Sequence, residues 1–146
     1  MQFNSIDVVV PTFYGKKKYS FDVIRNNLSI LKKYFQNVNY YLIVDFYKDV
    51  DNRFDYWEQN KNIGVNLYFK YNISGHKESF RCINFGVKIS KSDIVLIMDD
   101  DFLLSDKYLE SSLVNLNNTC AVFLNSFLIG DKRIPVSMSP SDESLT

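Results

Sequence analysis

Short apolar runs rich in β-branched residues alternate along this chain with segments of helical period. Five such runs predict strands, at residues 6–10, 40–44, 65–69, 94–98 and 120–124. Strands that alternate with helices form a mostly parallel sheet, because each connection crosses over one of its faces. The sequence therefore predicts an α/β fold with a mostly parallel central sheet and helices on both faces.

Three segments carry apolar residues at the steps of three and four that give a helix one buried stripe. The stripe of the first segment is Phe21, Ile24, Leu28, Leu31 and Phe35. The second helix is predicted over residues 77–89, with an inner stripe of Phe80, Ile83 and Val87. The third follows Ser105, a residue suited to an N-cap, and its stripe is Leu109, Leu113 and Leu116.

The chain has 146 residues, of which 46% are hydrophobic, which suits one domain with a sizeable core. Lys plus Arg and Asp plus Glu both number 17, so the net charge is zero and no nucleic-acid partner is expected. Cys82 and Cys120 lie in apolar patterns and are predicted to be core residues. No run approaches the ~20 apolar residues of a transmembrane segment, and no signal peptide is visible, so we expect a cytoplasmic protein.

Candidate ligand-binding residues directly follow three of the predicted strands. Pro11 and Thr12 follow the first strand, Asp45 follows the second, and Asp99–Asp101 follow the fourth. Because the carboxyl ends of parallel strands share one edge of the sheet, these residues are expected to converge there. Ligands of such sheets bind in the crevice outside that edge. This convergence is the main functional signal in the sequence.

Three adjacent carboxylates at the end of a buried strand repel one another. Two like charges ~4 Å apart cost about 4 kcal/mol at an effective dielectric near 20. The carboxylates either splay into water as a solvated acidic loop, or share a proton, or bind a cation. Oxygen ligands on a short turn suit a hard divalent ion, Mn²⁺ or Mg²⁺, which leaves coordination positions for phosphate oxygens. The triplet thus favours metal-assisted handling of a phosphorylated ligand.

Four segments resemble, in their order and spacing, motifs of the GT-A glycosyltransferases, in particular the family 2-like group. They are Val8–Thr12, Tyr41–Asp45, Phe80–Val87 and Ser92–Asp101. In that family the third motif is an Asn-x-Gly helix, and the fourth is a hydrophobic strand that ends in Asp-x-Asp. The resemblance covers roughly residues 5–126. It implies the Rossmann-like nucleotide-diphospho-sugar transferase (GT-A) fold.

The resemblance also implies a site for a nucleoside diphosphate sugar as the donor substrate. The loop that borders the nucleoside matches Pro11, Thr12 and Phe13, and the acidic residue that binds the base matches Asp45. Asp99 and Asp101 match the ends of Asp-x-Asp and imply the metal ligands, whereas Asp100 matches the residue near the ribose. The ion, Mn²⁺ or Mg²⁺, bridges the two phosphates in that family.

Arg81 is the further donor-binding candidate. The spacing of Lys77, Arg81, Asn84 and Lys88 places them on one face of the predicted helix, which would point Arg81 toward the donor. The alternative interpretation is a solvated basic face, which we prefer for the two lysines. Gly86 is expected to let the helix approach the sheet.

The resemblance predicts a nucleotide-sugar-binding domain over residues 1–134 and, over residues 135–146, a flexible tail or the start of a missing acceptor-binding segment. The implied function is metal-assisted transfer of a sugar to a glycan, lipid or protein acceptor, as in polysaccharide biosynthesis, with inversion as in most of that group. No general base is assigned, so the catalytic residues stay unknown. The alternative is a non-catalytic nucleotide-sugar-binding module, or a fragment that needs a partner chain.

A third function class is a phosphatase or phosphotransfer domain with an acidic strand end. Such phosphatases need Asp-x-Asp-x-Thr near the first strand. Here the acidic cluster follows a late strand, and Leu103 holds the position of the threonine. The sequence therefore favours the glycosyltransferase over this class.

Overall fold

The computed structural model describes residues 3–13, 21–46, 53–74, 76, 78–116, 124–129 and 132–137. The chain divides into two compact units, Met1–Asp101 and Phe102–Thr146. The elements of the first unit are β1 (Phe3–Phe13), α1 (Phe21–Tyr34), β2 (Phe35–Phe46), α2 (Arg53–Asn60), β3 (Asn66–Tyr71), α3 (Ser79–Ile89) and β4 (Val95–Ile97). Those of the second unit are α4 (Asp106–Leu116), β5 (Leu124–Ile129) and β6 (Lys132–Ser137).

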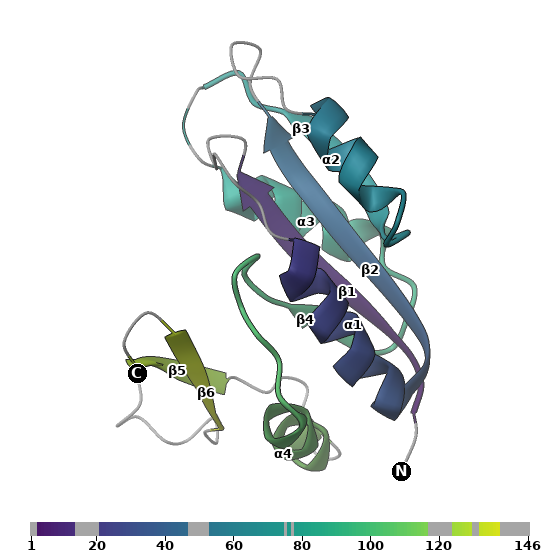
Figure 1. Cartoon of the computed structure of the whole chain (residues 1–146), viewed down its shortest axis with the longest axis vertical. Helices are drawn as coiled ribbons and strands as arrows, with labels where there is room; N and C mark the ends of the chain where they lie inside the picture. Colours follow the sequence, from purple (N-terminus) through teal and green to yellow (C-terminus); the bar gives the residue numbers. More distant parts are fainter. Residues whose placement is uncertain are drawn as a thin grey trace. The chain divides into compact units, whose positions relative to one another are not determined.

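The first unit is built on a four-stranded sheet in the order β3-β2-β1-β4. All three strand pairs are parallel. Helices α1 and α2 cover one face of the sheet and α3 covers the other (Figure 1). The predicted α/β fold with a parallel sheet between helices is therefore confirmed.

Strand β1 is the centre of this unit. Val8, Val9 and Val10 are completely buried, as is expected of a strand that is covered on both faces. The strand is longer than the predicted run 6–10, because it pairs with β2 from Phe3, opposite Phe35, to Phe13, opposite Asp45. The apolar run predicts the buried middle of the strand, whereas backbone pairing extends it at both ends.

Helix α1 buries three of the five residues of its predicted stripe, namely Phe21, Ile24 and Leu31. Leu28 is half-buried, and Phe35 is the first residue of β2 rather than part of the helix. Asn27 is completely buried on the same helix. A polar residue thus shares the inner face of α1 with the apolar stripe.

The predicted inner stripe of α3 is wrong. The side chains of Phe80 and Val87 are 62% and 44% exposed, and the buried residues are Cys82 and Gly86. A Cβ atom on Gly86 would collide with Cγ1 of Val9 and lie 2.7 Å from Cδ1 of Ile43. Small residues therefore form the contact face, because they let the helix axis approach the sheet closely. The predicted roles of Cys82 and Gly86 are confirmed.

The second unit begins its helix as predicted, since the backbone N–H of Tyr108 donates to Oγ of Ser105 at 3.2 Å. Leu109 and Leu113 are buried. Strands β5 and β6 form an antiparallel pair in which Ser126 lies opposite Pro135. Of the predicted strand 120–124, only residue 124 lies within the described residues, as the start of β5.

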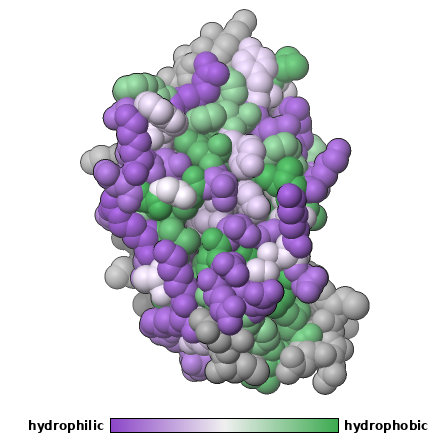
Figure 2. Space-filling model, turned by 90° about the vertical axis from the view of Figure 1, so that its right-hand side faces the viewer, coloured by the Kyte–Doolittle hydropathy of each residue, from purple (hydrophilic) through white to green (hydrophobic). Residues whose placement is uncertain are grey.

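Residues 135–137 lie in β6, and the alternatives for residues 135–146, a flexible tail or the start of a missing acceptor-binding segment, stay predictions. The functional division, with a nucleotide-sugar-binding domain over residues 1–134, stays a prediction. Within the described part of the chain, no helix is long and apolar enough to cross a membrane. Figure 2 shows one side of the molecule, where hydrophilic side chains prevail and hydrophobic groups lie among them.

Candidate functional site

The end of β1 and the acidic triplet meet at the carboxyl edge of the sheet. Thr12 donates a hydrogen bond from Oγ1 to Oδ2 of Asp100 at 2.7 Å, across a sequence separation of 88 residues. Thr12 is only 3% exposed and Asp100 is half-buried. The sheet brings these two strand ends together because β1 and β4 are parallel neighbours. The convergence predicted from the sequence is therefore observed for this pair.

The three aspartates of the triplet lie in different environments. Asp99 and Asp101 are exposed, whereas Asp100 between them turns toward β1. Directly before them, the backbone N–H of Met98 donates to the carbonyl oxygen of Val9 at 3.2 Å. Met98 itself is buried. The turn is thus attached to β1 on both sides of Asp99, with the outer carboxylates at the surface.

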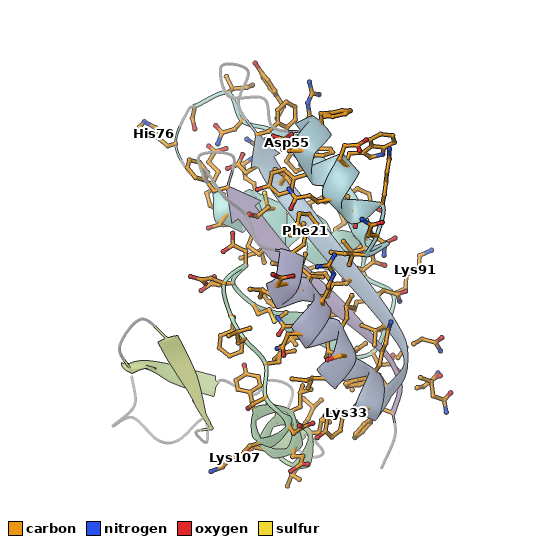
Figure 3. The ribbon with its side chains drawn as sticks, viewed as in Figure 1. Phe21, Lys33, Asp55, His76, Lys91 and Lys107 are labelled. Carbon is orange, nitrogen blue, oxygen red and sulfur yellow. The ribbon has the colours of Figure 1, made fainter. Side chains whose placement is uncertain are left out.

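Two buried tyrosines lie within electrostatic reach of Asp100. Burial raises the pKa of Tyr56 on α2; the Thr12 hydroxyl opposes this rise and the charge of Asp100 adds to it. Burial also raises the pKa of Tyr40 on β2. A hydrogen bond with the side chain of Asn27 opposes this rise, and the charge of Asp100 adds to it. The ring of Phe21, labelled in Figure 3, lies 6.2 Å from that of Tyr56. Sequence reasoning missed both tyrosines, because no spacing links them to the triplet.

Asp45 lies near the end of β2, where it is opposite Phe13 of β1. Its Oδ2 accepts hydrogen bonds from Nδ2 of Asn72 at 2.9 Å and from the backbone N–H of Glu78 at 3.0 Å. Asp45 and Asn72 are both buried. The carboxylate therefore joins the end of β2 to the segment after β3 and to the residue that precedes α3. Asn72 was not predicted to take part.

Arg81 lies on the exposed side of α3, together with Asn84 and Lys88. That this side faces a donor stays a prediction. Its Nη1 donates to Oε2 of Glu78 at 2.6 Å. This bond raises the pKa of Arg81 and lowers that of Glu78. The charge of Asp45 adds to the rise at Arg81, so the two groups are within electrostatic reach. Figure 3 shows His76, from the segment before α3, pointing outward into solvent.

The predicted site residues thus form two groups along one edge of the sheet. Thr12 and Asp100 make up the first group, and Asp45 and Arg81 the second. The register of β1 and β2 joins the groups, because Phe13 follows Thr12 and lies opposite Asp45. Pro11 is buried, so its ring belongs to the wall of this edge rather than to its surface.

The described residues contain no group of three or more His, Cys, Asp or Glu side chains arranged to hold a metal ion. The metal-binding residues predicted from the resemblance, Asp99 and Asp101, are two exposed carboxylates. Mg²⁺ and similar hard ions are commonly bound through one or two carboxylates, together with substrate phosphates and water. The donor set therefore fits an ion that is shared with a phosphorylated ligand, rather than one enclosed by protein ligands alone.

Comparison with known proteins gives similarity to solved structures only. No family model matches the sequence and no curated protein matches it. The chain is similar to a crystal structure of S. aureus TarS 1–349, with a TM-score of 0.46 and 20% identity over 80% of this chain and 32% of that one. A second crystal structure of S. aureus TarS gives the same score and identity over 88% of this chain and 21% of that one. The chain therefore spans about a third or less of these structures, and the likeness concerns the fold alone.

Proposed function

We propose that this chain is a GT-A, family 2-like glycosyltransferase, or the donor-binding part of one. It transfers a sugar from a nucleoside diphosphate sugar to a glycan, lipid or protein acceptor. The anomeric centre of the sugar is inverted, as in most of the family 2-like group. The observation that carries the proposal is the contact between Thr12 and Asp100. This contact places the acidic triplet beside the tip of the first strand, where an open parallel sheet binds its ligand.

The nucleoside of the donor is proposed to lie beside Pro11, Thr12 and Phe13. Phe13 is half-buried and is the last residue of β1. Asp45 lies opposite Phe13 in the register, which supports a role for its carboxylate at the same base. We propose that Asp45 reads the base while its Oδ2 continues to hold Asn72 and Glu78.

The diphosphate of the donor is proposed to lie outside the acidic triplet. Asp99 and Asp101 would hold a Mn²⁺ or Mg²⁺ ion there, and Asp100 would lie near the ribose. When bound, such an ion supplies positive charge that stabilises the leaving nucleoside diphosphate. Two exposed carboxylates suit this arrangement, since they leave coordination positions for phosphate oxygens.

Arg81 is proposed as a second source of positive charge for the donor. Its guanidinium is exposed and pairs with Glu78, also at the surface. An ion pair at the surface is screened by water and is weak, so a phosphate can replace Glu78 at little cost. The charge of Asp45 contributes to the raised pKa of Arg81, which supports a position of the guanidinium near the proposed base subsite.

The alternative is a module that binds a nucleotide sugar without turning it over, and that needs a further segment or a partner chain for transfer. The two functions differ in one measurable product, the nucleoside diphosphate released from the donor. Release from UDP-, GDP- or TDP-sugars in the presence of Mn²⁺, and its loss in Asp101→Ala, is expected for the glycosyltransferase. Asp93→Ala is the matched control, since Asp93 is an exposed aspartate before β4.

Binding of the donor without release would support the module. Neither binding nor release with any donor would overturn both functions. Release that is unchanged in Asp101→Ala would remove the acidic triplet from the mechanism.

A further inference from the structure

The hydroxyl of Thr12 is already committed inside the protein. It has one proton, and that proton is donated to Oδ2 of Asp100 at 2.7 Å. The residue is 3% exposed, so little of its surface can touch a ligand. The resemblance to the GT-A glycosyltransferases implies a residue that borders the nucleoside. The observed contact indicates a second role, which is exerted through Asp100.

The partner of this hydroxyl is the middle residue of the acidic triplet. If all three carboxylates faced the same space, their charges would repel one another. The hydrogen bond from Thr12 holds the carboxylate of Asp100 against the end of β1, where Asp100 is half-buried. Asp99 and Asp101 stay at the surface on either side. The bond thus sorts the triplet into one inner and two outer carboxylates.

The backbone before the triplet is fixed to the same strand. The backbone N–H of Met98 donates to the carbonyl oxygen of Val9, three residues before Thr12. At the other end of β4, the backbone N–H of Asp7 donates to the carbonyl oxygen of Ile94 at 3.0 Å. The Thr12 bond is therefore the side-chain continuation of the β1–β4 pairing, beyond the last backbone bond.

We propose that Thr12 is a positioning residue, which holds the acidic turn on the tip of β1 through Asp100 and so keeps Asp99 and Asp101 at the places where they meet the donor. Its effect on the ligand rests on the proposed function. Its effect on the turn does not, and the two are measured separately.

The effect on the turn is read from amide hydrogen exchange, resolved by residue with NMR. In Thr12→Val, which removes the hydroxyl and keeps the shape, the amide of Met98 is expected to exchange faster. The amide of Asp7 is the internal reference and stays at its wild-type rate, since it pairs with the far end of β4. Thr12→Ser keeps the hydroxyl and is expected to restore the wild-type rate at Met98.

The effect on the ligand is read from the affinity for nucleoside diphosphates in the presence of Mn²⁺. The hydrogen bond from Thr12 has a charged acceptor and is therefore a strong one. We expect its loss in Thr12→Val to weaken the binding of nucleoside diphosphates about tenfold, and we expect Thr12→Ser to bind close to wild type. Asp100→Ala removes the acceptor at a half-buried position and is expected to repeat both effects of Thr12→Val. It carries the test if circular dichroism shows Thr12→Val to be unfolded.

The outcomes separate the two claims. A wild-type chain that binds no nucleotide rejects the proposed function, and the exchange rate at Met98 then decides the positioning role alone. Wild-type exchange at Met98 in both Thr12→Val and Asp100→Ala overturns that role. Faster exchange with unchanged nucleotide affinity also overturns it, because the turn would then loosen without consequence for the ligand.

Discussion

Asp7 and Ser92 are 85 residues apart in the sequence, yet the buried carboxylate of Asp7 accepts two hydrogen bonds from Ser92. The backbone N–H of Ser92 donates to Oδ2 at 3.0 Å and its hydroxyl donates to Oδ1 at 2.8 Å. Lys91 and Asn39 supply two further donors, at 2.6 Å and 2.8 Å. Asp7 thus fixes the start of β4, and the bond between Thr12 and Asp100 fixes the turn that follows its end.

Removal of this carboxylate is expected to destabilise the first unit. Asp7→Ala removes the acceptor of the backbone N–H groups of Lys91 and Ser92, and a hydrogen bond to a charged group contributes about 1.5–3 kcal/mol. We expect the free energy of unfolding in urea to fall by about 3 kcal/mol. Asp93→Ala, in the same turn but exposed, should stay within about 0.5 kcal/mol of wild type. Equal stabilities of the two variants would contradict the assignment.

The same carboxylate predicts a dependence of stability on pH. Burial raises the pKa of Asp7, but the hydrogen bonds from Asn39, Ser92 and Lys91 together bring it below its ordinary value of 3.8. The folded state therefore binds this proton less tightly than the unfolded state. The stabilisation is present above pH 3.8 and is lost as the pH falls through the lower pKa of the folded state.

Unfolding experiments between about pH 6 and about pH 2 measure this dependence. The free energy of unfolding of the wild type should fall toward low pH more steeply than that of Asp7→Asn, which has no carboxylate to protonate there. Parallel curves for the two proteins would show that Asp7 does not supply the effect.

Gly86→Ala tests the close approach of α3 to the sheet. On an exposed helix position this change usually stabilises, by about 0.5–1 kcal/mol. Here the new Cβ would collide with Val9 and lie 2.7 Å from Cδ1 of Ile43. Because overpacking a core costs about 1–3 kcal/mol, we expect a lower melting temperature. Asn84→Ala, on the exposed side of α3, is the control and should melt at or above the wild-type temperature.

The amide of Asn72 is expected to support the placement of Asp45. Asn72 is completely buried, and its Nδ2 donates both to Asp45 and to the carbonyl oxygen of His76. Asn72→Ala should lower the free energy of unfolding by about 2 kcal/mol, since it leaves a buried carboxylate with one donor fewer. Ile73→Ala, at a neighbouring residue that is 79% exposed, should have little effect. A larger loss in Ile73→Ala would contradict this assignment.

The sequence predicted the order of the elements well, because apolar period and strand burial are local signals. The buried run of β1 and the cap at Ser105 follow from such signals. The meeting of Thr12 with the triplet follows from the parallel topology that the order of strands and helices implies. Residue size was harder to use: the contact face of α3 is set by Gly86 and Cys82, whereas the larger apolar residues Phe80 and Val87 are exposed. The spacing of apolar residues does not show where a helix needs small residues in order to pack closely against a sheet.

The buried polar contacts were beyond prediction from one sequence. Asp7, Tyr56 and Asn72 find partners that are far away in the chain or come from another element, and no spacing marks these pairs. The same holds for the pairing of β5 with β6, whose residues carry no marked alternation. Long-range pairing is decided by the packed fold, so it appears only once the strands are placed side by side.

The central claim is that the carboxyl edge of the first unit binds a nucleoside diphosphate with the help of the outer carboxylates. Titration calorimetry of the whole chain with UDP, GDP and TDP, with and without Mn²⁺, tests it most directly. We predict binding of at least one nucleotide that strengthens with Mn²⁺ and loses this dependence when Asp99→Asn and Asp101→Asn are combined, but not in Asp93→Asn. Absence of Mn²⁺-dependent binding for all three nucleotides would contradict the account.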